Sequence, residues 1–333
     1  MRKKYYIPYL VFLFLVCLCT SCKGKQEQTS TEDEAETVLR GPIFNEDSAM
    51  TYCAKQCEFG PRTMNSEAHE KCCEWIADKF RSLGCDVTLQ KADLKGWDGT
   101  TLKSTNIIAT FGNVDVNKTS SQEGQKGLLL CAHWDSRPWA DNDPDETKHK
   151  EPVMAANDAA SGVGVMLELA RIFSEKRDSL PYPITFVCLD AEDYGTDNDE
   201  NSWALGAQYL AKHLPQTFKE GILLDMVGGQ GSKFYQEGVS LHYAPNLVSD
   251  VWQTAQDAGY GSYFPMEQGG FITDDHKPLN EAGIPTIDII PYYPDCEQSA
   301  FGPTWHTTQD DMQHMDKNVL KAVGQTISEY IVR

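Results

Sequence analysis

The chain has 333 residues, of which 41% are hydrophobic and 23% charged, a composition typical of a globular protein. The formal net charge of −20 argues against a role in nucleic-acid binding, because phosphate contacts need clustered Lys and Arg rather than an acidic surface. The same acidity disfavours adsorption to an anionic membrane, so we expect membrane contact only through a lipid anchor.

Residues 1–21 are predicted to be a signal peptide that directs export. A basic start at residues 2–4 precedes an apolar run, Ile7–Leu18, that is too short to cross a bilayer. Small or apolar residues at 19–21 then lead into Cys22, a pattern that resembles a bacterial lipobox. We therefore expect the protein on the periplasmic side, anchored to a bacterial membrane by a lipid on Cys22. The alternative is signal cleavage without a lipid.

Residues 22–44 are expected to form a flexible tether, because they are polar and rich in Gln, Ser, Thr and Glu. Residues 45–333 contain no internal repeat and no second linker, so we predict one catalytic domain. We also expect a monomer.

The first predicted element of this domain is an amphipathic helix over residues 65–84. Asn65 or Ser66 would cap its start, apolar side chains recur on one face, and Gly84 would end it. Five cysteines lie in or near this region, and export makes disulfides among them possible, so their pairing stays open. Cys131 and Cys188 lie in apolar runs and are expected to be buried thiols.

Four later runs are short and apolar on both faces, which predicts buried strands. They are Leu128–Ala132, Ile184–Leu189, Ile222–Leu224 and Thr286–Ile290. Helices are predicted at 160–173, 205–214, 246–258 and 316–333. This alternation predicts an α/β fold, a three-layer α/β/α sandwich with a mixed, mostly parallel central sheet.

Several of these strands run into potential metal ligands. His133 and Asp135 follow the first strand, residues 190–193 follow the second, and Asp225 follows the third. Open α/β sheets place their sites beyond the carboxyl ends of the strands, so these side chains should gather at one edge. Singly, each has a simpler explanation; Asp158, for example, could merely cap the helix that follows it. Their joint occurrence predicts a metal site.

The order of these residues resembles that of the M28 zinc aminopeptidase superfamily, over roughly residues 45–333. The matching residues are His133, Asp135, Asp158, Glu192, Asp193, Asp225 and His306. The resemblance implies that Asp158 is a metal ligand, that Glu192 is the general base and that Asp193 binds zinc. Many members have Glu where this chain has Asp193, and the shorter carboxylate needs its backbone nearer the metal.

Finer features resemble the glutaminyl-peptide cyclotransferase branch of that superfamily. They are Trp305-His306-Thr307, the segment 273–278 and the strand end at 223–228. This resemblance implies one zinc ion held by Asp158, Asp193 and His306. It makes Glu192, Asp225 and Asp274 catalytic, and Trp305 and His133 substrate-binding. A second pocket Trp of animal members lacks a clear counterpart, because Trp203 is out of register.

The sequence leaves three functions to compare. The first is an exported cyclotransferase that converts N-terminal glutamine of peptides and exported proteins to pyroglutamate, with release of ammonia. The second is a two-zinc aminopeptidase of the M28 type. The third is a catalytically inactive surface lipoprotein, a hypothesis that rests on the tether and on Asp193.

Overall fold

The computed structural model describes residues 38–111, 127–176 and 180–333. The predicted signal peptide, Cys22 and the first part of the predicted tether lie outside the described residues. The compact unit that contains the remaining chain spans Thr37–Arg333.

A six-stranded mixed sheet forms the centre of this unit, in the order β1-β2-β4-β3-β5-β6. The strands are β1 Asp86–Lys95, β2 Thr101–Phe111, β3 Gly127–His133, β4 Ile184–Leu189, β5 Phe218–Leu224 and β6 Thr286–Ile289. The pairs β4–β3, β3–β5 and β5–β6 are parallel, whereas β1–β2 and β2–β4 are antiparallel. The four predicted strands are confirmed, and the antiparallel pair β1–β2 was not predicted.

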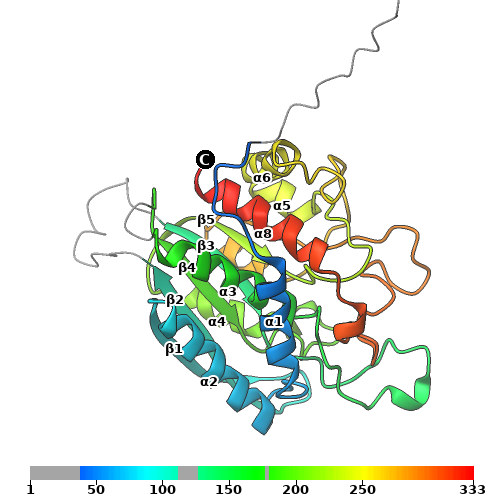
Figure 1. Ribbon diagram of the computed structural model, residues 1–333. Coiled ribbons are helices and arrows are strands. Elements are labelled where there is room, and N and C mark those ends of the chain that lie inside the picture. Colours follow the sequence, from blue (N-terminus) through cyan, green and yellow to red (C-terminus); the bar gives the residue numbers. More distant parts are fainter. Residues whose placement is uncertain (1–37, 112–126, 177–179) are drawn as a thin grey trace, which may run out of the picture. The chain divides into compact units, whose positions relative to one another are not determined.

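Helices cover both faces of the sheet, so the predicted three-layer α/β/α sandwich is confirmed (Figure 1). The helices are α1 Glu46–Cys57, α2 Glu67–Ser82, α3 Ala160–Ser174, α4 Leu205–Lys212, α5 Gly238–Tyr243, α6 Pro245–Asp257, α7 His276–Glu281 and α8 Lys317–Ile331. Short 3-10 turns are η1 Glu146–Lys148, η3 Glu200–Ser202 and η4 Met312–His314. The larger core lies between the sheet and α1, α2, α3, α6 and α8, and a smaller one lies under α4 and α7.

Local signals explain where the predicted helices begin and end. Ser66 caps α2, since its side chain accepts a hydrogen bond from the backbone N–H of His69. Gly84 follows the helix with φ of 87°, a left-handed conformation that glycine adopts without steric cost. Among the described residues, no helix is long and apolar enough to cross a membrane.

The end of the predicted tether is fixed on α8, so the boundary expected at residue 44 is wrong. The backbone N–H of Arg40 donates to Glu329 at 2.8 Å, and that of Phe44 donates to Gln325 at 2.8 Å. The Phe44 ring is fully buried against the core, because Gly324 of α8 leaves room for it. The ordered domain therefore begins before residue 45.

All eight cysteines in the described part of the chain are free thiols. Cys131 and Cys188 are buried in strands, as predicted. The disulfides that export would permit among the first five of the eight do not form here.

Candidate active site

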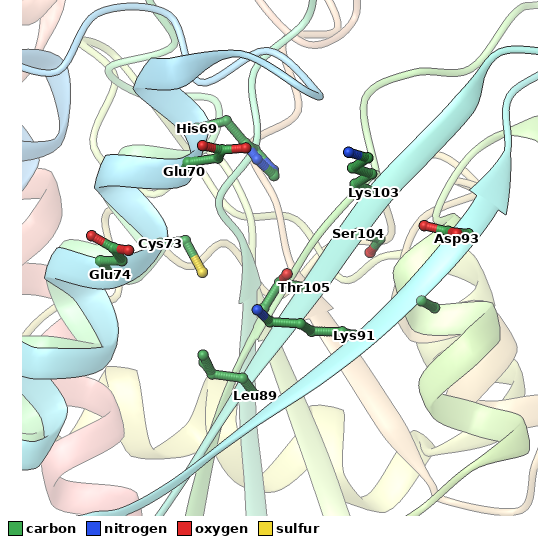
Figure 2. A pocket seen from close by; sticks show the side chains of 11 residues that line it. His69, Glu70, Cys73, Glu74, Leu89, Lys91, Asp93, Lys103, Ser104 and Thr105 are labelled. Atoms are coloured by element: carbon green, nitrogen blue, oxygen red, sulfur yellow. The ribbon is translucent and has the colours of Figure 1, made fainter.

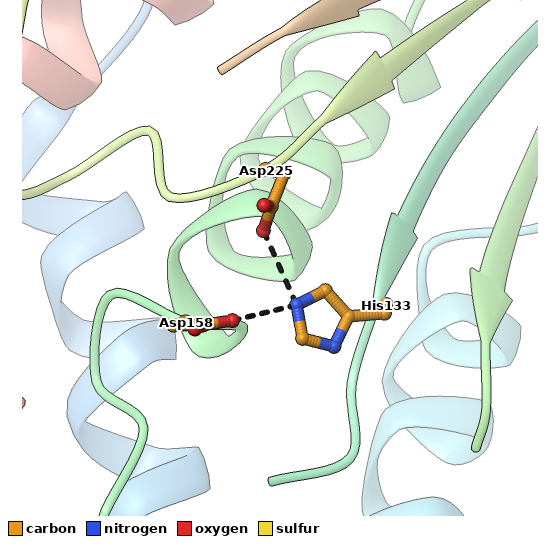
Figure 3. A group of neighbouring side chains, drawn as sticks. All are labelled: His133, Asp158 and Asp225. Atoms are coloured by element: carbon orange, nitrogen blue, oxygen red, sulfur yellow. Dashed lines mark hydrogen bonds and ion pairs between the residues drawn. The ribbon is translucent and has the colours of Figure 1, made fainter. Parts of the chain in front are cut away.

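The predicted ligands meet at the carboxyl edge of the parallel strands. His133 ends β3, Asp225 directly follows β5, and Asp158 precedes α3. Figure 3 shows the side chains of these three residues pointing toward one another from their separate elements. Because β3 and β5 are neighbouring parallel strands, their carboxyl ends bring residues distant in sequence together, as the sequence predicts.

The backbone around this edge is strained at several non-glycine residues. Ala191 (φ 54°), Met226 (φ 53°) and His306 (φ 54°) all adopt the left-handed conformation. Such residues cost on the order of 1–3 kcal/mol each and cluster at functional sites. Here they lie directly before Glu192, directly after Asp225 and at His306 itself.

Asp158, Asp193 and His306 form a buried group that can hold a metal ion. His306 Nε2 lies 3.1 Å from Asp193 Oδ1 and 3.8 Å from Asp158 Oδ2. Both carboxylate oxygens of Asp193 are buried and accept no hydrogen bond of good geometry. Since a buried carboxylate without a donor is costly, and zinc accepts Asp oxygen and His nitrogen, the three residues fit zinc. The shorter Asp193 side chain still reaches His306.

His133, Asp158 and Asp225 form a second group, which shares Asp158 with the first. His133 Nε2 lies 2.9 Å from Asp158 Oδ1 and 3.2 Å from Asp225 Oδ1 (Figure 3). Burial lowers the pKa of His133, but hydrogen bonds to Asp135, Asp158 and Asp225 outweigh it and raise the pKa well above its usual value. His133 is buried and lies outside the lining of the pocket, although it was expected at the substrate.

The explanation of Asp158 as a helix cap is wrong. The cap residue of α3 is Ala159, and no side chain caps the helix. The loop is held instead by Asp310, which accepts hydrogen bonds from the backbone N–H of Asn157 at 2.7 Å and of Asp158 at 3.0 Å. Burial and the nearby charge of Asp158 raise the pKa of Asp310 to about 7. Asp310 escaped prediction because its partners are backbone groups far away in sequence.

A pocket of about 270 Å³ opens onto the first metal-capable group. Its lining comprises Asp158, Glu192, Asp197, Glu200, Trp203, Asp225, Met226, Ile272, Thr273, Asp274, Ile290, Phe301, Trp305 and His306. It thus holds carboxylates and apolar side chains but no Lys or Arg. All predicted site residues other than His133 and Asp193 line it, and Asp193 lies directly behind His306.

Two tryptophans flank His306 in this pocket. The rings of Trp305 and His306 stack at 3.8 Å between centroids, and those of Trp203 and His306 at 6.0 Å. Trp203, which we expected to be out of register with the second pocket Trp of animal members, thus lines the pocket. Trp203 is presented by the loop between β4 and α4, where Arg137 lies 4.8 Å from its ring. The path of that loop, rather than the spacing in sequence, places the indole.

The acidic side chains of the pocket carry perturbed pKa values. Burial raises the pKa of Glu192 well above its usual value; His133 opposes this shift, and the charges of Asp193 and Asp274 add to it. Burial also raises the pKa of Asp225 to about 8, against a hydrogen bond from His133 and with help from the charge of Asp274. A bound cation would lower both pKa values. Carboxyls that hold protons near neutral pH are suited to general acid–base chemistry.

Comparison with known proteins gives the family. Residues 106–331 match the model of peptidase family M28. The chain is 30% identical to the aminopeptidase YwaD of Bacillus subtilis over 73% of its length, but it covers only 47% of that protein.

Solved structures cover the chain more fully. The glutaminyl cyclase of Bacteroides thetaiotaomicron, bound to N-acetylhistamine, is 46% identical, with a TM-score of 0.81 over 88% of this chain and 99% of the other. The glutaminyl cyclase of Porphyromonas gingivalis is 44% identical, with a TM-score of 0.82 over 87% and 99%. These matches and the site geometry confirm the family recognised from the sequence: the chain is an enzyme that belongs to peptidase family M28.

Proposed function

We propose that this chain is a zinc-dependent glutaminyl-peptide cyclotransferase. It converts the N-terminal glutamine of peptides and proteins to pyroglutamate and releases ammonia. The proposal is supported by the two glutaminyl cyclases at 44–46% identity and, above all, by one observation about the pocket. The observation is that a small pocket combines the metal-capable His306, two indoles and the carboxyl of Glu192.

The pocket is suited to one uncharged side chain. At about 270 Å³ it lies just below the usual range for drug-sized ligands, so it accommodates a single residue rather than a long segment of substrate. Trp203 and Trp305 supply flat apolar walls on which the methylene groups of glutamine can pack. This confinement favours the folded conformation in which the α-amine approaches the side-chain amide, the main requirement of an intramolecular reaction.

Asp158, Asp193 and His306 would hold one zinc ion. When bound, zinc supplies Lewis-acid polarisation of the γ-carbonyl of the glutamine side chain. Two observations support this assignment over the second group: His306 lines the pocket whereas His133 does not, and Asp193 accepts no hydrogen bond of good geometry.

Glu192 is the group that moves the proton. The α-amine forms a bond to the γ-carbonyl carbon, the bond from that carbon to the amide nitrogen breaks, and ammonia leaves. Glu192 accepts the proton of the amine and donates it to the departing nitrogen, so no external reactant is consumed. The raised pKa of Glu192 suits both halves of this transfer.

Asp225 and Asp274 would bind the α-amine. Both line the pocket, and burial raises the pKa of each, so the two carboxyls can share a proton between them. His133 contacts Asp225 and Asp158 but does not line the pocket, so it would affect substrate binding by positioning these two carboxylates.

The second candidate function is a two-zinc aminopeptidase. One observation favours it: His133, Asp158 and Asp225 form another group with metal-capable spacing beside the first. In that case Glu192 would serve a water molecule rather than the substrate amine, and the first residue of the peptide would be removed.

The substrates and location follow from the predicted leader. We propose export and a lipid on Cys22, so that exported proteins with N-terminal glutamine are the natural substrates. In this proposal Cys22→Ala moves the protein from the membrane to the soluble fraction. Unchanged membrane association of that variant would contradict the lipid anchor.

A mass measurement tests the function. The purified chain is incubated with a short peptide that begins with Gln, and the peptide mass is followed. Loss of one ammonia with the chain length intact supports the cyclotransferase, and a zinc chelator should stop it. Loss of the whole first residue supports the aminopeptidase. Absence of both reactions in the zinc-loaded protein would contradict both functions.

A further inference from the structure

A second cavity, lined by none of the active-site residues, lies between α2 and the hairpin of β1 and β2 (Figure 2). Its volume is about 640 Å³, and charged side chains of α2 and of the two strands surround it. These exposed charges do not form a binding site by themselves. The lining residue His69 is buried, and its contacts lead from the cavity to the catalytic loop.

His69 is held on several sides. Its backbone N–H donates to Ser66 at 3.1 Å, at the start of α2. Its ring stacks on Trp134 with 4.2 Å between centroids and an angle of 20° between planes. Its Nε2 lies 2.8 Å from Asp190 Oδ1, and the two side chains are 4% and 0% exposed. The imidazole therefore has little freedom to leave Asp190.

Asp190 stands where β4 ends and the catalytic loop begins. Its Oδ1 accepts the backbone N–H of Ala191 at 2.9 Å, and its Oδ2 accepts that of Thr105 at 2.6 Å. With His69, the carboxylate thus has three hydrogen-bonding partners. Ala191 adopts the left-handed conformation, φ 54°, so this contact fixes a strained turn.

Side-chain oxygens hold the backbone N–H groups of this loop, and backbone N–H groups of Ala204 and Leu205 donate to its carbonyls. Every backbone N–H from Asp190 to Asp193 donates to a side-chain oxygen. That of Asp190 donates to Asn106 at 3.0 Å and that of Ala191 to Asp190 itself. Those of Glu192 and Asp193 donate to the two carboxylate oxygens of Asp135, at 3.1 and 3.2 Å.

Among the described residues, His69 is the only side chain with an ion-pair contact to Asp190. Without His69, a buried carboxylate would keep only backbone partners and would rotate or draw in water from the cavity. Burial lowers the pKa of His69, but the charge of Asp190 outweighs it and raises the pKa, which is consistent with a close pair.

We propose that His69 is a positioning residue for catalysis, which acts through Asp190 to fix the Ala191 turn and thereby aims Glu192 and Asp193 into the active site. The inference rests on the proposed role of Glu192 as the base. It assigns a function to a residue of α2 that does not line the active-site pocket and contacts neither substrate nor metal.

The test compares His69→Ala, His69→Gln and Gln325→Ala. Gln325 is a matched control, because it is buried in α8 and accepts a hydrogen bond from Phe44 N at 2.8 Å, within another part of the fold. We expect His69→Ala to lower kcat by about 10- to 100-fold with little change in KM, since small displacements of catalytic groups cost about this much. His69→Gln keeps a donor for Asp190 and should recover most of kcat. Gln325→Ala should lower Tm but keep kcat.

Three results would overturn the inference: unchanged kcat in His69→Ala, an equal loss in His69→Gln, or the same loss in Gln325→Ala. If His69→Ala does not fold, Asp190→Asn provides the second measurement. It should lower kcat, and adding His69→Gln to it should lower kcat no further; independent losses would contradict the pair. Failure of the proposed function would look different, because the unmodified chain would then not cyclise the peptide at all.

Discussion

The two ligand groups that share Asp158 differ in whether the histidine lines the pocket. In the group of Asp158, Asp193 and His306, the histidine lies 3.1 Å from Asp193 Oδ1 and lines the pocket. In the group of His133, Asp158 and Asp225, the histidine contacts both carboxylates within 3.2 Å, and it lies outside the pocket lining. We call the first group open, because its histidine lines the pocket, and the second closed, because its histidine does not.

This difference shows how one fold can support two chemistries. The same residue types at the same strand ends can hold a metal or can form a hydrogen-bonded network. Which they do depends on the pairing of each polar atom and on access from the pocket. We therefore assign binding to the open group and positioning to the closed one.

The largest effect is expected from removing a ligand of the open group. His306→Ala should lose both zinc and activity, with a fall in kcat/KM on the order of a thousandfold, because a lost metal takes transition-state stabilisation with it. The matched variant in the closed group, His133→Ala, should keep its zinc. Zinc analysis of both purified proteins checks this, and equal loss of metal would erase the distinction between the groups.

A large but different effect is expected at Glu192. Glu192→Gln should retain zinc and lower kcat by about 100- to 1,000-fold, because the amide cannot accept and return the proton. Zinc content and kcat are measured on the same sample. Normal turnover in this variant would contradict the role of Glu192 in proton transfer and would mean that another group is the base.

The pair of Glu237 and His276, which does not line the pocket, should affect stability more than binding. Burial raises the pKa of Glu237, but hydrogen bonds from His276 and from backbone N–H groups lower it to about 2. Since this lies below the unfolded value of about 4.3, the pair contributes up to about 3 kcal/mol above pH 4.3 and loses it as pH falls toward 2. Glu237→Gln should therefore be less stable than the unmodified chain at pH 7.

The measurement is denaturant unfolding at several pH values. The difference between the two proteins should shrink as the pH falls below about 4. A difference that stays constant down to pH 3 would mean that Glu237 contributes through packing and neutral hydrogen bonds instead.

The smallest effect is expected from the exposed acidic residues of the pocket. Asp197 and Glu200 line it, and the lining has no Lys or Arg. Peptides with Lys after the N-terminal Gln should be converted more efficiently than peptides with Glu there, by about 3- to 10-fold in kcat/KM at low salt. Asp197→Asn should reduce this preference more than Asp199→Asn, which removes the same charge from the same loop but outside the lining. Equal effects of the two variants would contradict a local contact.

Much of this site could be predicted because its ligands follow buried strands. Ile184–Leu189 is apolar on both faces, and its predicted bounds are those of β4. Strand β1 escaped because all its side chains are exposed or half-buried and show no apolar run. His133, Asp158, Glu192 and Asp225 likewise gather at one edge of the sheet, as expected.

Other parts of the site depend on the course of loops, which a pattern of residue types does not give. Trp203 reaches the pocket only through the shape of the loop that precedes α4. Asp310 acts on the backbone of Asn157 and Asp158, so no spacing rule marks it. The link from His69 to Asp190 joins α2 to the end of β4, and only the folded chain brings the two together.

The most direct test of the account is a zinc titration of the metal-free protein, with peptide products followed by mass. We predict that full activity returns at one zinc per chain and that the product is the intact peptide less one ammonia. Activity that requires two zinc ions and yields a peptide shortened by its first residue would contradict the account, and would make His133 and Asp225 ligands of the second ion.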